Sequence, residues 1–125
     1  MLTVFQTLQL VSFALLMSLG QVLFKKTALT ISHINEQKQV LGLFEGVFAA
    51  LMTPWLYFAL IVYGTATIFW LYLLQRIPLS VAYPFGAIAM VLVPIFSVYL
   101  FGDKLNINYW FGMTFIIIGI SIIAR

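Results

Sequence analysis

Residues 15–26 read LLMSLGQVLFKK, an apolar run that ends on two lysines and decides how the rest of the chain is interpreted. The run passes through the polar residues Ser18 and Gln21 and stops at Lys25 and Lys26. Lysines in this position hold a membrane helix at the interface, because their long stems lie along apolar surface while the charged heads reach water. The same two cations are also suited to an anionic substrate. The stretch alone leaves both interpretations open.

The composition places the whole chain in the membrane. Of its 125 residues, 64% are hydrophobic and 7% are charged; a soluble domain has charges on about a quarter of its residues. Because a bilayer-spanning helix needs about 20 apolar residues, there is room for four spans in a single domain, residues 1–125. The sequence therefore predicts an all-α membrane protein: four transmembrane helices plus a short interfacial helix between spans one and two.

The composition also argues against catalysis. There is no cysteine, and one histidine with three acids leaves little material for a nucleophile-base pair or a metal cluster. The net charge of +3 contains no cluster larger than two cations, which argues against nucleic acid. We therefore expect no enzyme activity, no metal, no cofactor and no nucleic-acid partner.

Polar residues and prolines mark the boundaries of the expected elements. The segment 27–42 is clearly aqueous and is expected to be a loop. In the segment that follows, apolar residues recur at helical spacing with Glu45 off their face, which predicts a short interfacial helix. The expected spans are residues 3–24, 55–74, 79–101 and 107–124, and the interfacial segment is residues 40–53.

The third span contains two prolines, Pro84 and Pro94. In a soluble helix each would cost about 3 kcal/mol. In a membrane, neighbouring helices and side-chain hydroxyls can satisfy the carbonyls that proline leaves free. We therefore expect this helix to be bent and not broken.

The basic residues favour an N-terminus outside the cytoplasm. Four lysines then lie on the cytoplasmic side and two arginines on the other, as the positive-inside rule requires: Lys25, Lys26, Lys38 and Lys104 against Arg76 and Arg125. The bias is weak, so an antiparallel pair of identical chains stays open.

Small residues indicate where helices approach closely, because apolar contact alone does not drive helices together in lipid. In the third span Ala82, Gly86 and Ala89 form one narrow stripe, and in the fourth Gly112 and Gly119 lie one heptad apart. Both stripes are expected to pack helices within the bundle. The stripe of the fourth span is alternatively a dimer seam.

Polar residues of the first span share one face. Ser18, Gln21 and Lys25 fall within a narrow arc at about 100° per residue. We predict that this face lines a wet cavity, although a glutamine in a span also serves as an interhelical hydrogen-bond partner. The opposite wall is expected on the second span, at Tyr63, Thr67 and Trp70; membrane aromatics otherwise face lipid or the interface.

Several motifs resemble the drug/metabolite transporter superfamily. Residues 78–125 contain P-x-x-[VI]-A-Y at the start of span three, an FG-(D/E/Q)-(K/R)-L turn and the G-x-x-x-x-x-x-G of span four. Upstream, GQVLFKKTA and PWLYFALIVYG also fit, so the resemblance covers nearly the whole chain outside residues 28–50. It implies a small EamA-like transporter of the bacterial inner membrane.

One four-span branch of that superfamily, the small multidrug resistance proteins, fits poorly. Its members are dimeric, proton-coupled exporters of cationic aromatics that depend on a glutamate in span one, and Met17 occupies the aligned position. A thioether neither exchanges protons nor pairs with a cation. The tyrosine that cages substrate in that branch aligns with Tyr83, but the neighbouring tryptophan position is Gly86.

The other branch, the aminoarabinose-lipid flippase subunits, fits better. Its members resemble this chain at LGQ and in the lysine that follows, and the resemblance implies paired small subunits that move sugars linked to undecaprenyl phosphate. Such a lipid is anionic and needs cations at the interface. Lys25, Lys26 and Arg76 are available for the phosphate, with simple interfacial anchoring as their alternative role.

We therefore expect a flippase in which the polar face of span one and Tyr83 surround the sugar. The partners would be membrane lipids, the lipid-linked anionic substrate and either a second copy or a similar small subunit. Two alternatives stay open: an exporter of cationic drugs or metabolites, and a non-transporting membrane subunit of a larger assembly.

Overall fold

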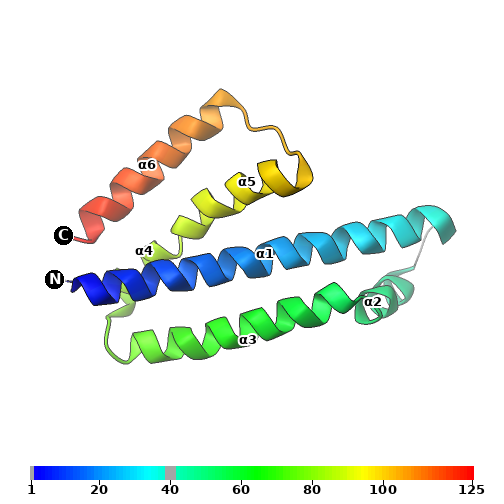
Figure 1. The fold of residues 1–125 in the computed structure, drawn as a ribbon, viewed down its shortest axis with the longest axis horizontal. Helices are drawn as coiled ribbons and strands as arrows, with labels where there is room; N and C mark the ends of the chain where they lie inside the picture. The colour runs from blue at the N-terminus through cyan, green and yellow to red at the C-terminus, as the bar shows by residue number, and fades with distance from the viewer. Residues whose placement is uncertain (1, 39–41) are drawn as a thin grey trace.

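The computed structural model describes residues 2–38 and 42–125. Within these ranges the chain is all helical, as the sequence predicts (Figure 1). Helices suit an apolar chain because their backbone hydrogen bonds are satisfied within the segment. The helices are α1 (Val4–Lys38), α2 (Leu43–Leu51), α3 (Pro54–Leu74), α4 (Leu79–Phe85), α5 (Ile88–Phe101) and α6 (Ile107–Ile123).

Three segments of the described chain are long and apolar enough to cross a membrane: Val4–Ile34, Pro54–Leu74 and Leu79–Phe101. They contain or match the first three expected spans. α6 is a shorter apolar helix of 17 residues and lies within the fourth. Pro54 starts α3 because its missing N–H costs nothing in the first helical turn.

The expected loop at residues 27–42 is wrong for residues 27–38, because α1 continues to Lys38. That stretch contains no proline or glycine to stop the helix. The hydroxyls of Thr27 and Thr30 each donate to the carbonyl one turn earlier, at 2.9 Å. At 1.5 Å per residue the 35 residues of α1 extend over about 52 Å, so the helix is longer than a hydrocarbon core of about 30 Å.

The third expected span is bent and not broken, as predicted: Gly86 and Ala87, which join α4 to α5, keep right-handed helical backbone angles. α4 ends at Phe85 and α5 begins at Ile88. Between them, the N–H groups of Gly86 and Ala87 donate to carbonyls three residues earlier, at 2.9 and 3.0 Å. Such bonds tighten the chain into a turn. Pro84 favours a bend in this segment, because it has no N–H for the carbonyl at position 80 and its ring crowds that carbonyl.

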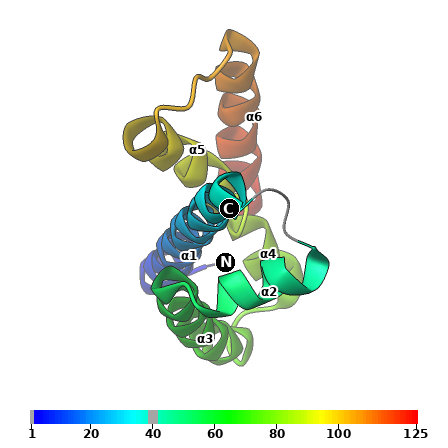
Figure 2. The same cartoon turned by 90° about the vertical axis from the view of Figure 1, so that its right-hand side faces the viewer.

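α1 lies at the centre of the packing. Figure 2 shows it between α3 on one side and α5 and α6 on the other. Small residues allow close approach, and Ala14, Ala59 and Ala82 are completely buried. The buried core is formed by Leu10, Phe13, Ala66, Leu73, Ile77, Ala82 and Phe85.

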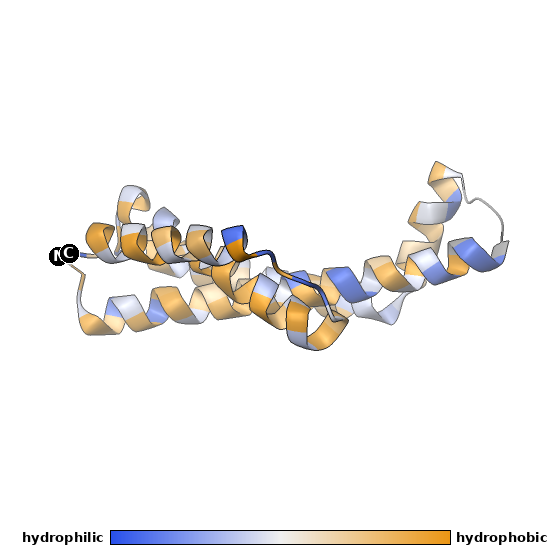
Figure 3. Ribbon diagram, turned by 90° about the horizontal axis from the view of Figure 1, so that it is seen from above, coloured by the Kyte–Doolittle hydropathy of each residue, from blue (hydrophilic) through white to orange (hydrophobic). Residues whose placement is uncertain are grey.

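α2 confirms the short helix expected between the first two spans. Its apolar residues, including Leu43, Phe44 and Phe48, are exposed, as is Glu45. Figure 3 shows hydrophilic residues gathered at the C-terminal end of α1, close to α2. An exposed apolar face beside a polar helix end is what a helix at the membrane interface requires.

The glycine stripe on α6 makes no close contact within the described chain. A Cβ built at Gly112 or at Gly119 would have no atom within 4 Å. By contrast, a Cβ at Gly86 would lie 3.1 Å from the Tyr83 carbonyl oxygen. Packing inside this chain therefore does not explain the two α6 glycines.

Candidate functional site

A pocket with charged residues lies between α1 and the C-terminal end of α5. This charged pocket has a volume of about 380 Å³, and Gln21, Lys25, Val93, Ser97 and Asp103 are among the residues that line it. Gln21 and Lys25 lie one turn apart on α1 and face the same space, which places two of the sequence-predicted site residues together.

Asp103 is held in the charged pocket by the end of α5. Gly102 closes the helix in the left-handed conformation, with φ of 71°, which glycine adopts without steric cost. The turn brings Asp103 back toward α5, where the Ser97 hydroxyl donates to its carboxylate. Lys25 also lines this pocket, and within the described residues it is not within 4.0 Å of a carboxylate oxygen.

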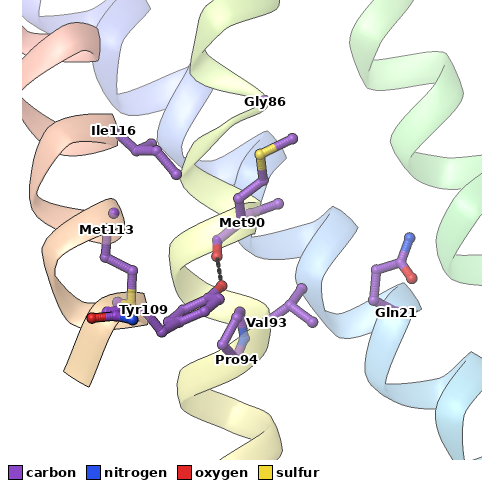
Figure 4. A pocket seen from close by; sticks show the side chains of 11 residues that line it. Gln21, Gly86, Met90, Val93, Pro94, Tyr109, Met113 and Ile116 are labelled. Carbon is purple, nitrogen blue, oxygen red and sulfur yellow. Dashed lines mark hydrogen bonds between the residues drawn. The ribbon is translucent and has the colours of Figure 1, made fainter. Parts of the chain in front are cut away.

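An apolar cleft of about 670 Å³ opens between α5 and α6 (Figure 4). It shares Gln21 and Val93 with the charged pocket, so the two spaces adjoin along the α1–α5 boundary. Asn108 and Tyr109 are its polar residues on α6. The remaining lining is Gly86, Ala89, Met90, Val93, Pro94, Gly112, Met113 and Ile116.

A side-chain hydrogen bond joins α6 to α5 at the edge of this cleft. The Tyr109 hydroxyl donates to the Met90 carbonyl at 2.8 Å (Figure 4). In an unbroken helix this carbonyl would accept from the N–H at position 94, which Pro94 does not have. The prediction that a neighbouring hydroxyl satisfies a carbonyl freed by proline is confirmed here.

A third space, the aromatic pocket, has a volume of about 480 Å³ and brings together the aromatic residues expected on two spans. Phe13 and Trp70 stack with ring centroids 4.6 Å apart, and Tyr63 stacks on Phe24 at 4.8 Å. The Tyr63 hydroxyl is buried and has no hydrogen-bond partner in the described part of the chain. The lining includes Phe13, Met17, Tyr63, Thr67, Trp70 and Tyr83.

The predicted polar face of span one does not form one continuous wall. Ser18 is fully buried and donates its hydroxyl to the Ala14 carbonyl of its own helix, at 2.7 Å. A hydroxyl satisfied in this way can be buried without another partner. Met17, and not Ser18 or Gln21, shares the aromatic pocket with Tyr63.

The three predicted cations lie in three different surroundings. Lys25 lines the charged pocket, whereas Lys26 lies over the ring of Trp55 at 4.4 Å. Successive residues of a helix point about 100° apart, which separates the two lysines. Arg76 lies over the ring of Tyr72, at 5.0 Å.

Arg76 and Arg125 line a further pocket of about 240 Å³, the terminal pocket, at the end of the molecule where the two termini lie together (Figure 1). Gln6 lines the same pocket and precedes Lys25 by 19 residues on α1, which corresponds to about 28 Å at 1.5 Å per residue. The structure therefore places Lys25 and Arg76 at opposite ends of the bundle, in agreement with the expected separation of lysines and arginines.

Two residues of the charged pocket escape sequence reasoning. Asp103 is expected only as a surface residue of the α5–α6 turn, and Ser97 carries no motif of its own. Their order in the sequence could have indicated that they lie together. The Ser97 hydroxyl comes near the end of α5, Gly102 closes the helix, and Asp103 follows directly.

Comparison with known proteins gives a consistent result. The EamA-like transporter family matches residues 1–125. A protein of Aeromonas salmonicida named probable 4-amino-4-deoxy-L-arabinose-phosphoundecaprenol flippase subunit ArnE is 38% identical over 112 residues, covering 90% of each chain. A protein of the same name from Escherichia coli is 32% identical over 112 residues, covering 90% of this chain and 91% of its own. Another, from Pseudomonas syringae, is 36% identical over 84 residues, covering 67% of this chain and 76% of its own. No solved structure matches the chain.

Proposed function

This chain belongs to the EamA-like transporter family, and from that premise we propose that it is a subunit of a flippase for 4-amino-4-deoxy-L-arabinose-phosphoundecaprenol. It is a multi-pass protein of the bacterial inner membrane. The observation that carries the proposal is the match to flippase subunits over 90% of both chains. The adjoining charged pocket and apolar cleft fit a lipid that has an anionic head and a long hydrocarbon tail.

The phosphate of this lipid is held by Lys25. A lysine ammonium attracts phosphate as a point charge, and Lys25 is exposed to the charged pocket without a carboxylate at ion-pair distance among the described residues. The first isoprene units then follow the shared wall at Val93 into the apolar cleft, which is open toward the lipid. Lys26 serves as an interfacial anchor through its contact with Trp55.

The sugar passes the aromatic pocket on its way across the membrane. This pocket shares Gly86 and Met90 with the apolar cleft, so the two spaces adjoin at the bend between α4 and α5. Tyr63, Trp70 and Tyr83 offer apolar faces with polar groups at their edges. The Tyr63 hydroxyl itself is buried, beside the Gln21 side chain, so the ring and not the hydroxyl faces the sugar.

Arg76 and Arg125 receive the phosphate at the far end. They line the terminal pocket, about one hydrocarbon thickness away from Lys25. Lys25 and the two arginines are too far apart to hold one phosphate at the same time, so they act at successive stages. The lipid is loaded at Lys25 and released at the arginines.

The subunit crosses the membrane four times and works with a partner. α6 has 17 residues and extends over about 26 Å, close to a hydrocarbon core of about 30 Å. The relatives are named as subunits, and a Cβ at Gly119 on α6 would meet no atom within 4 Å among the described residues. We place the partner, a second copy or a similar small subunit, on the Gly119 face of α6.

An exporter of cationic drugs is less well supported. In such a protein a carboxylate in span one pairs with the cation or a proton. Here that position is Met17, which brings a thioether to the aromatic pocket. The lining residues of that pocket have no negative charge to offer a cationic drug.

The function is tested by reconstitution. The gently solubilised protein, with any partner that copurifies, is placed in liposomes with the labelled aminoarabinose lipid, and its appearance in the opposite leaflet is measured with a membrane-impermeant amine reagent. We expect flipping that Lys25→Gln reduces and that Lys104→Gln, outside the lining of the charged pocket, does not. Uptake of cationic dyes driven by a pH gradient, with no lipid movement, would contradict the proposal.

A further inference from the structure

We propose that Asp103 recognises the sugar amine of the lipid substrate, with Ser97 holding the carboxylate in position. The inference rests on the proposed function and adds a determinant of specificity to it. The lipid named for the relatives has two charged groups: the phosphate, which is anionic, and the 4-amino group, which is a cation at neutral pH. A site that distinguishes this sugar from neutral ones needs a carboxylate close to its phosphate-binding cation.

The charged pocket supplies this pair of opposite charges. Lys25 enters it from α1, and Asp103 enters it from the turn after α5. Both side chains are exposed, so each stays solvated without the other, because exposed ion pairs gain little. Within the described chain these two remain more than 4.0 Å apart, with about 380 Å³ of space between the surrounding walls. A zwitterionic head group fits between them, with its phosphate toward Lys25 and its amine toward Asp103.

The position of Asp103 is set by the same turn that ends α5. The left-handed turn at Gly102 directs the chain back, and the Ser97 hydroxyl donates to one carboxylate oxygen. That hydrogen bond leaves acceptor sites on the carboxylate for the three donors of an ammonium group.

The orientation of the lipid follows from the lining on each side. The apolar cleft adjoins the charged pocket at Gln21 and Val93, so the hydrocarbon tail leaves in that direction. The amine and the glycosyl phosphate lie on opposite sides of the sugar ring. With the phosphate at Lys25, the amine therefore points away from the tail, toward Asp103 at the α5–α6 turn.

The test compares binding of two lipids to the full-length protein in phosphatidylglycerol nanodiscs: the aminoarabinose lipid and its N-acetylated form, which has lost the positive charge. We expect the wild type to prefer the amine form by roughly tenfold, which is the effect of one charge-assisted hydrogen bond. Asp103→Asn should reduce this ratio to about one, because asparagine keeps the acceptor for Ser97 and loses only the charge. Ser97→Ala should lower the ratio in part.

Three comparisons separate the inference from its premises. Lys25→Gln should weaken both lipids alike and keep the ratio, and Glu45→Gln on α2 is the matched control that removes an acid outside the pocket. Failure of the wild type to bind either lipid would overturn the function itself, whereas an unchanged ratio in Asp103→Asn would overturn only the role of Asp103. Phosphatidylethanolamine also carries a phosphate and an amine. Its equal competition for the site would show a general head-group site and overturn the assignment to the sugar.

Discussion

The ring of Tyr63 lies so close to Gly20 that a Cβ at position 20 would be 2.7 Å from Tyr63 Cε2 and 2.9 Å from Cζ. Gly20 is buried in α1, and Tyr63 reaches it from α3. The absence of a side chain at Gly20 therefore allows Tyr63 to occupy the wall of the aromatic pocket. One missing methyl group thus links the packing of the two helices to the shape of the candidate site.

Gly20→Ala should destabilise the protein. The added methyl group must displace the Tyr63 ring, and overpacking of this kind costs about 1–3 kcal/mol. The unfolding free energy in detergent micelles measures the change. Gly64→Ala is the matched control, because a Cβ there meets no atom within 4 Å and alanine favours the helix by about 1 kcal/mol. Equal effects of the two substitutions would show that Tyr63 does not press on Gly20.

Tyr109→Phe should weaken the joint between α5 and α6. It removes the donor to the Met90 carbonyl, and interhelical hydrogen bonds in membranes contribute about 0.6 to 2 kcal/mol. The cost should fall in a Pro94→Ala background, because alanine restores the N–H that normally serves this carbonyl. Unfolding measurements on the two single variants and the double variant give the coupling. Strict additivity would contradict this explanation of the hydrogen bond.

Loss of Lys25 should affect lipid binding, whereas loss of Lys26 should affect stability. Lys26→Gln removes the contact with the Trp55 ring and should cost stability, about 0.5–2 kcal/mol. Lys25→Gln should leave stability nearly unchanged and weaken binding of the aminoarabinose lipid. Thermal unfolding and lipid binding, measured on the same samples, separate the two effects. Equal loss of binding in both variants would mean that both lysines contact the phosphate.

Gly119→Leu should affect association and not the fold of the subunit. A Cβ at this position has open space within 4 Å, and leucine favours a helix over glycine. If the partner packs on this face, the larger side chain keeps the helices apart. Chemical cross-linking in membranes measures the associated fraction, and Gly64→Leu on α3 is the control. Association at the wild-type level would place the partner elsewhere.

Sequence reasoning succeeded where a property is local. The all-helical class and the short helix between the first two spans follow from composition and periodicity, and the expected second span, residues 55–74, differs from α3 only by Pro54 at its start. The same reasoning was wrong at residues 27–38, where polar character was taken as a loop although nothing in the stretch stops a helix. The bend of the third span was predicted correctly, since Gly86 and Ala87 keep helical angles between α4 and α5 and only tighten the turn.

For the site, the sequence indicated the aromatic residues and Lys25 but not how they are grouped. The expectation that Gln21 and Ser18 face Tyr63 and Trp70 assumed that one face of α1 meets one neighbour. In the structure that face meets several neighbours: Ser18 is buried, and Met17 lines the aromatic pocket. Gln21 lies beside Tyr63, as expected, and also at the junction of the charged pocket and the apolar cleft.

By itself, the sequence determined that this protein is a helical membrane protein. Hydropathy and helix-breaking residues decide helix formation locally, within a few turns of the chain. Only the tertiary structure decided that Lys25 and Asp103 share one pocket although they are far apart in sequence, and that Lys26, next to Lys25, does not. Such a grouping depends on which helix faces meet and where the turn at Gly102 directs the chain. No local pattern carries that information.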